Sequence, residues 1–155
     1  MVSASLGIDI EAARRKCIKA VENGSAINKM KEGVSAQGGN PDFIDDESLF
    51  TLAPYKRELL AERDGYISAV RADAVGEASM LLGAGRRTKE DTIDLGAGIE
   101  LKAKIGHFVK KNQPIAVLYA SHESLFDSAV KKLKEAFIYS ANPTEKSPLI
   151  YKTIK

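Results

Sequence analysis

The chain has 155 residues, of which 44% are hydrophobic and 28% charged, and this composition is typical of a globular protein with one compact domain or two small ones. Its 23 basic and 21 acidic residues leave a net charge of only +2, so no basic field exists to attract nucleic acid or an anionic membrane. Cys17 is the single cysteine, which excludes an intrachain disulfide and fits a reducing compartment. Residues 1–10 lack the features of a signal peptide, and no apolar run approaches the roughly 20 residues that span a bilayer. We therefore expect a cytoplasmic protein with no nucleic-acid and no membrane partner.

Two helices are predicted at the start of the chain. Asp9 is expected to cap the first, which Asn23-Gly24 ends, and Ser25 to cap the second, which Gly38-Gly39 ends. Their apolar residues recur at helical spacing and form a stripe suited to packing on another element. Cys17 lies in this stripe, so we expect it to be buried and unreactive. The stripe consists of Ile10, Ala13, Cys17, Val21, Ile27, Met30 and Val34.

A change of composition follows the helices. From Gly38 to Pro54 the sequence is rich in Gly, Asn, Pro and acidic residues and shows no periodic apolar face. The sequence therefore predicts two parts, residues 1–45 and residues 46–155.

The second part is predicted to be rich in strands, with its clearest pattern between Leu81 and Ala120. Alternating apolar residues predict strands over 55–62, 66–70, 99–103 and 115–119, with Ile115, Val117 and Tyr119 on the buried face. Helices are expected after Asp73 and after Ser121, which are the predicted caps. Residues 138–140 are read as a further strand, and residues 148–155 as a short edge strand or an extended arm.

The segment Gly83-Ala84-Gly85-Arg86 suggests two hypotheses. Glycines and arginine could hold a phosphate, because backbone amides can approach an anion and a guanidinium can bind it with two hydrogen bonds. However, phosphate loops follow a strand and open a helix, whereas this segment follows a helix and precedes a strand. We therefore interpret Gly83, Gly85 and Arg86 as a structural loop between domains, with Gly83 at a positive φ angle.

The sequence shows no catalytic constellation. His107 and His122 are the only histidines, and neither has a cysteine or carboxylate at a familiar metal-ligand spacing. His107 is expected to be a solvent-exposed turn residue and His122 to sit at a helix N-terminus. We thus predict no catalytic, substrate-binding, cofactor-binding or metal-binding residue in this chain.

Five motifs in a fixed order resemble the C-terminal portion of the pyrimidine-nucleoside phosphorylases, the family that includes thymidine phosphorylase. The resemblance covers nearly the whole chain. It implies an α+β chain in which an α/β-hammerhead domain of barrel-sandwich type follows two helices of a larger α/β domain. The motifs are AQGGN at 36–40, DGYI at 64–67, LGAGR at 82–86, DTIDLGAGIEL at 91–101 and the G-x-x-V-x-x-x-x-P-I-A run at 106–116.

The same resemblance implies the activity of a longer protein. The family cleaves thymidine, uridine or deoxyuridine with phosphate, the co-substrate, to give the free base and a (deoxy)ribose 1-phosphate, and it works as a homodimer. No cofactor is expected in this chain. Its phosphate-binding K-x-S-T-G-G segment and its base-binding Arg with S-x-x-x-K do not occur in this chain. We therefore expect the chain to be a fragment that begins at Met1-Val2 and is inactive alone, with a structural role in the parent enzyme.

Two alternatives remain at this stage. The paired glycine and Pro-Ile-Ala pattern is also similar to the half-repeats of biotinyl and lipoyl carrier domains, which need a modifiable lysine on a hairpin between the repeats. Lys89 lies in the polar stretch RTKED, and the lysines of Lys29-Met30-Lys31 belong to a predicted helix outside the module, so neither fits that place well. A purely structural or dimerising role is compatible with every pattern above.

Overall fold

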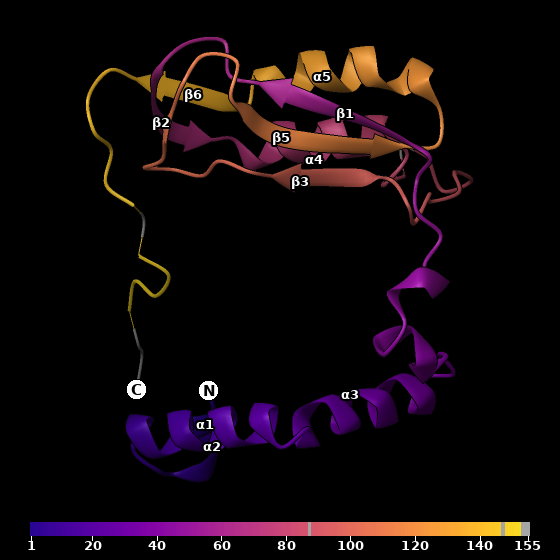
Figure 1. The fold of residues 1–155 in the computed structure, drawn as a ribbon, viewed down its shortest axis with the longest axis vertical. Helices are drawn as coiled ribbons and strands as arrows, with labels where there is room; N and C mark the ends of the chain where they lie inside the picture. Colours follow the sequence, from indigo (N-terminus) through magenta and orange to yellow (C-terminus); the bar gives the residue numbers. More distant parts are fainter. Residues whose placement is uncertain (87, 147, 153–155) are drawn as a thin grey trace. The chain divides into compact units, whose positions relative to one another are not determined.

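The computed structural model describes residues 1–86, 88–146 and 148–152. The chain divides into two compact units, Met1–Phe50 and Thr51–Lys155 (Figure 1). The division falls between Phe50 and Thr51, a few residues after the boundary that composition suggested, and the two units are described separately below.

The first unit is helical. Asp9 caps α2 as predicted, because its carboxylate accepts a 2.8 Å hydrogen bond from the amide of Ala12. The predicted cap at Ser25 is wrong: Gly24 occupies the N-cap of α3 at φ +76°, a left-handed conformation that favours glycine, and Ser25 is the first residue of the helix. The elements are α1 (Val2–Leu6), α2 (Ile10–Glu22), α3 (Ser25–Ala36) and the short 3-10 turns η1 (Pro41–Ile44) and η2 (Glu47–Leu49).

The apolar stripe of the first unit is largely uncovered within that unit. Ala13 is the only buried residue of α2, and α3 has none. Val21 is 72% exposed and Met30 58% exposed. Cys17 is also exposed, so the expectation of burial is wrong, because the face on which it lies finds no packing partner in this unit.

The described residues of the second unit form two three-stranded antiparallel sheets and two α-helices (Figure 1). One sheet has the order β1-β5-β3 and the other the order β4-β2-β6. Its elements are β1 (Tyr55–Leu60), β2 (Gly65–Val70), α4 (Ala72–Leu81), β3 (Gly98–Leu101), β4 (Phe108–Val109), β5 (Pro114–Ala120), η3 (Glu123–Leu125), α5 (Phe126–Lys134) and β6 (Phe137–Ser140).

Strand β5 is the centre of the first sheet, paired on one side with β1 and on the other with β3. The predicted alternation along this strand is wrong, because Ala116 and Leu118 are as fully buried as Ile115. A central strand covered on both faces carries a continuous apolar run instead of an alternating one. The run from Ile115 to Leu118 is therefore buried throughout.

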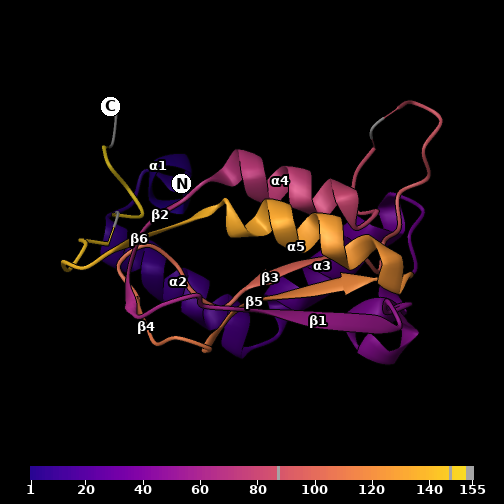
Figure 2. The ribbon, with the colours of Figure 1, turned by 90° about the horizontal axis from the view of Figure 1, so that it is seen from above.

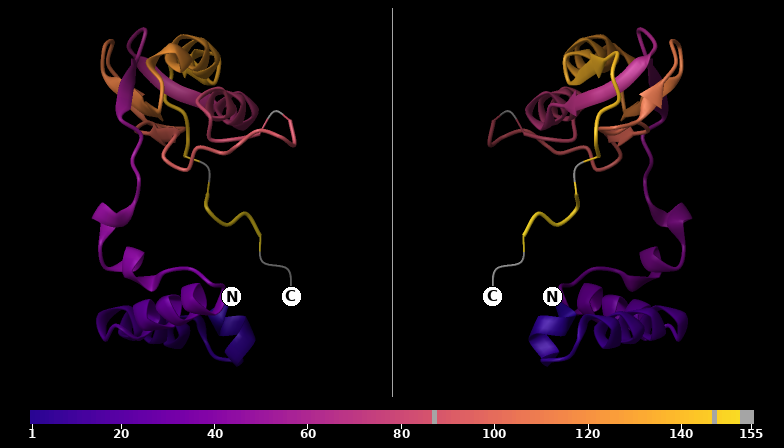
Figure 3. Two further views of the ribbon diagram at one scale, coloured as in Figure 1. Left: turned by 90° about the vertical axis from the view of Figure 1, so that its right-hand side faces the viewer. Right: turned by 90° about the vertical axis from the view of Figure 1, so that its left-hand side faces the viewer.

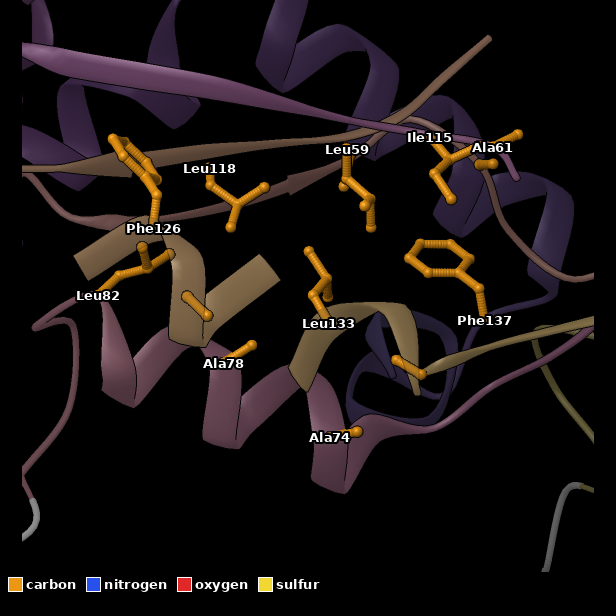
Figure 4. Close-up of a cluster of buried hydrophobic side chains, with 14 of the residues drawn as sticks. Leu59, Ala61, Ala74, Ala78, Leu82, Ile115, Leu118, Phe126, Leu133 and Phe137 are labelled. Carbon is orange, nitrogen blue, oxygen red and sulfur yellow. The ribbon is translucent and has the colours of Figure 1, made fainter. Parts of the chain in front are cut away.

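The core lies between the strands and the helix pair. Helices α4 and α5 pack against each other (Figure 2). Figure 4 shows their side chains pointing toward side chains from β1 and β5, with Leu133 facing Leu59 and Phe126 beside Leu118. Burying large aliphatic and aromatic side chains contributes roughly 1.5–3 kcal/mol each, so this layer is the main source of the unit's stability.

Two predicted caps are corrected by the structure. Arg71 takes the N-cap of α4, and Asp73 sits inside the first turn, where its carboxylate pairs with the Arg71 guanidinium at 2.6 Å. Ser121 does not cap the last helix either, because its hydroxyl bonds to a distant carboxylate described below. His122 is the N-cap of η3, which leads into α5.

The mixture of helices and antiparallel strands confirms the α+β class. The predicted last strand is confirmed as β6. The described part of the C-terminal tail, residues 148–152, contains no strand, and Leu149, Ile150 and Tyr151 are strongly exposed, which favours the extended arm. Residues 153–155 of the predicted tail lie outside the described residues.

Candidate functional site

The turn at Gly83 ends α4 with a Schellman motif. The amide of Ala84 donates to the carbonyl of Ser79, and the amide of Gly83 donates to the carbonyl of Met80, both at 3.1 Å. Gly83 has φ +100°, so the predicted positive φ angle is confirmed. The last carbonyls of α4 thereby find backbone donors, and this end of the helix, where the dipole is negative, does not favour an anion.

Asp94 fastens the long loop between α4 and β3, which projects from the second unit in Figure 3. Its amide donates to the carbonyl of Gly83 at 2.9 Å. Its carboxylate accepts from the Ser121 hydroxyl at 2.6 Å and from the Gly96 amide at 2.9 Å. These hydrogen bonds lower the pKa of Asp94, and the bond from Ser121 has the largest effect. The carboxylate is therefore charged, and its hydrogen bonds hold the loop in place.

Gly85 and Arg86 differ in their surroundings. A Cβ on Gly85 would lie 3.3 Å from the Cβ of Met80, so the chain passes close to the helix at this point. Arg86 is exposed, and no hydrogen bond or ion pair holds its guanidinium within the described residues. Of the three predicted loop residues, Gly83 is a glycine because of its positive φ angle and Gly85 because of its close approach to Met80. Arg86 is free to contact something outside this chain.

A hollow of about 290 Å³ lies beside this turn, between Met80, Gly85, Thr92 and Leu125. The next stretch of the loop is itself internally bonded, since the amide and hydroxyl of Thr88 both donate to the carboxylate of Asp91, at 3.0 and 2.8 Å. Among the described residues that line this hollow, the one carboxylate, that of Asp91, is already engaged and no histidine, cysteine or lysine is present, so the hollow offers surface for contact and no evident catalytic set.

The two histidines occupy separate places. His122 begins η3. His107 is only partly exposed and lines a hollow, so the expectation of a solvent-exposed turn residue is wrong. Across the described ranges of the chain, no group of three His, Cys, Asp or Glu side chains could hold a metal ion.

The hollow at His107 measures about 530 Å³ and is also lined by Lys104 and Lys146. Sequence reasoning missed it because Lys146 is far from Gly106 in the chain and comes close only through the fold. At Gly106, φ is +84° and a Cβ would lie 2.7 Å from the Cγ of Lys146. The glycine at this position was the only signal in the sequence that another segment approaches there.

The lysines considered for a carrier domain lie in unsuitable places. Lys89 is exposed in the loop between α4 and β3, and Lys29 and Lys31 belong to α3 in the first unit. None of them stands on a hairpin joining two paired strands of the second unit.

No helix within the described residues has the length and apolar character needed to cross a membrane. Residues 66–140, which run from β2 to the end of β6, match the family model described as the pyrimidine nucleoside phosphorylase C-terminal domain. The chain is therefore built around the strands and helices of that domain.

Full-length relatives give the same result. The chain is 44% identical over 145 residues to the pyrimidine-nucleoside phosphorylase of Geobacillus stearothermophilus, an alignment that covers 94% of this chain and 33% of that protein. It is 39% identical to the pyrimidine-nucleoside phosphorylase of Staphylococcus haemolyticus and 37% identical to that of Bacillus subtilis, in each case over 99% of this chain and 35% of the relative.

The chain belongs to the pyrimidine-nucleoside phosphorylase family and corresponds to the C-terminal portion of its members. It spans about a third of the length of the curated relatives that it matches.

Proposed function

We propose that the chain is the C-terminal domain of an enzyme that cleaves thymidine or uridine with phosphate, and that its own role is structural. The observation that carries the proposal is the match of residues 66–140 to the C-terminal domain of that family, together with the near full coverage of this chain by phosphorylases. The two three-stranded sheets with their helix pair are compatible with the α/β-hammerhead arrangement that we propose for residues 46–155.

The proposed reaction needs groups that this chain does not bring together. In phosphorolysis a phosphate oxygen forms a bond to the anomeric carbon while the bond from that carbon to the base nitrogen breaks. The base leaves with the bonding electron pair and takes up a proton. Such a step needs donors that hold phosphate in line and groups that stabilise the departing base. The hollow beside Gly83 offers neither, so we propose that this chain alone is inactive.

The first unit supports a structural role in a longer protein. Its helices α2 and α3 present Ile10, Val21, Ile27 and Met30 to solvent, an arrangement suited to packing on a partner. We propose that residues 1–45 belong to the larger α/β domain of the parent enzyme, and that the exposed stripe packs on the sheet of that domain. Within the same proposal the parent enzyme is a cytoplasmic homodimer that uses phosphate as co-substrate and needs no further cofactor.

Two experiments test the proposal. The purified chain, incubated with thymidine and phosphate, should release no thymine above background when the mixture is separated by chromatography. Turnover that follows the purified chain would contradict the inactivity.

The second experiment is a chimera of the Geobacillus stearothermophilus phosphorylase in which this chain replaces the matching C-terminal third. The chimera should cleave thymidine and uridine, because this chain would supply the packing that the native third supplies. A matched chimera carrying Leu118→Asp should lose both folding and activity, since Leu118 is fully buried. A folded but inactive first chimera would count against the proposed role.

A further inference from the structure

The hollow at His107 has an apolar interior. Val70, Val75, Leu101 and Ile105 line it, from the end of β2, the first turns of α4, the end of β3 and the connection to β4. All of these residues belong to the second unit, whose elements pack on one core. A volume of about 530 Å³ lies within the range of roughly 300–1,000 Å³ that small-molecule sites occupy.

The polar groups of this hollow all carry nitrogen donors. They are the ammonium groups of Lys104 and Lys146 and the imidazole of His107, and no carboxylate of the described residues lines the hollow. Among the described residues, none of the three side chains forms an ion pair or a hydrogen bond.

Other lysines of the same unit behave differently. Lys132 pairs with Glu77 at 2.7 Å, Lys134 pairs with Glu62 at 3.0 Å, and Lys102, next to the hollow in sequence, pairs with Glu100. The hollow therefore combines apolar walls with two lysine ammonium groups whose N–H donors are not bonded to any described residue.

We propose that this hollow binds a small amphipathic anion, with an apolar body about the size of two fused rings and one carboxylate. The body would replace water against Val70, Val75, Leu101 and Ile105, and the carboxylate would accept hydrogen bonds from Lys104, His107 or Lys146. This ligand class is independent of the nucleoside and phosphate proposed above, because both of those are predominantly polar.

A matched pair of probes tests the proposal on the intact chain. 2-Naphthoate and its neutral amide, 2-naphthamide, share one body and differ in charge. In ¹H–¹⁵N NMR titrations naphthoate should give saturable shifts confined to residues 70–75, 101–107 and the segment at Lys146. The amide should bind at least about threefold more weakly, because it cannot pair with the lysines.

Three variants sharpen the test. Lys104→Gln and Lys146→Gln should each weaken naphthoate binding about three- to fivefold and leave amide binding unchanged. Lys131→Gln removes the same charge from an exposed position of α5 that does not line the hollow, so it should change neither affinity. Amide spectra of each variant establish that it is folded.

Several results would overturn the proposal. These are an absence of saturable shifts, equal binding of naphthoate and naphthamide to the unaltered chain, or shifts centred on residues 10–36. Shifts at the hollow that depend on protein concentration without any probe would also overturn it, since another copy of the chain would then fill the site. The comparison of the two probes on the unaltered chain decides the question even if a variant fails to fold.

Discussion

Ser121 donates a 2.6 Å hydrogen bond to Asp94 across 27 residues of sequence, joining the end of β5 to the loop that follows α4. Asp94 in turn accepts from the Gly96 amide and donates its own amide to Gly83. The amide and the carboxylate of Asp94 together fix the turn at the end of α4 and the segment before β3 against the central strand.

Replacing Ser121 with alanine should lower the free energy of unfolding at pH 7 by about 1 kcal/mol, which is the usual net contribution of one hydrogen bond. The effect should depend on pH. The hydrogen bonds lower the pKa of Asp94 below its ordinary value of 3.8, so the stability that they contribute is complete above that value. It is lost as the pH falls through the lowered pKa of the folded state.

Urea unfolding of the parent chain and of Ser121→Ala at pH 7 and at pH 3 checks this prediction. The difference between the two proteins should shrink at the lower pH. Ser128→Ala, which removes a hydroxyl that bonds only within its own turn, is the control and should show a small difference that does not change with pH. A constant difference for Ser121→Ala would show that Asp94 is not the group through which Ser121 acts.

Gly83→Ala should cost roughly 1 kcal/mol, because alanine is strained at φ +100°. Gly76→Ala is a matched control within the same helix: nothing lies within 4 Å of its added Cβ, so it should stabilise the protein by about 0.5–1 kcal/mol. Arg86→Ala should cost less than Gly83→Ala, since its side chain is exposed. Thermal or urea melts of the three variants give the order, and a larger loss from Arg86→Ala would contradict it.

Leu133→Ala should cost about 2–5 kcal/mol, because Leu133 is fully buried between the helix pair and the strands and its removal leaves a cavity. Leu95→Ala deletes the same atoms from a side chain that is 93% exposed and should change stability by less than about 0.5 kcal/mol. Equal losses from both variants, measured by urea unfolding, would show that the core does not lie where Leu133 packs.

The exposed stripe on α2 and α3 should make the isolated chain self-associate or leave these helices frayed, because a helix of about 12 residues is marginal in water without packing. Residues 55–140 should instead show strong protection from hydrogen exchange. A chain beginning at Thr51 should keep that protection and scatter light as a monomer. Val21→Glu with Met30→Glu in the full chain should also abolish association, whereas loss of protection on truncation would show that the second unit depends on the first.

The sequence predicted most elements because their signals were local. Asp9 stands before a helical repeat and Gly83 after one, and both positions follow from backbone chemistry within one turn. Ser25 and Asp73 were misplaced by one or two positions, and the remaining errors came from contacts that the local sequence does not carry. Ser121 has the local context of a helix cap, yet Asp94 takes its hydroxyl, and Cys17 was assigned to a packed face that the unit leaves uncovered.

The same limit applies to the sites. The Gly83 turn could be recognised from sequence, because a glycine directly after a helical repeat predicts the end of the helix. The hollow at His107 could not, because Lys146 joins it from the far end of the domain. The buried run of β5 was misread as alternating for a different reason. A period of two assumes one covered face, whereas the unbroken apolar sequence from Ile115 to Leu118 is itself typical of a strand covered on both faces.

Strand pairing in the second unit also determines when it can fold. Among the described strands, none pairs with the strand next to it in sequence: β1 pairs with β5, β2 with β4 and β6, and β3 with β5. The pairings of β1 with β5 and of β2 with β4 and β6 each close a loop of more than 40 residues before they gain contacts, which places the unit among slow-folding topologies, with times of milliseconds to seconds. During synthesis β1 and β2 leave the ribosome unpaired and wait for partners more than 40 residues downstream. A nascent chain halted before β5 would leave β1 and β3 without their partner, and chaperone binding should concentrate on that interval.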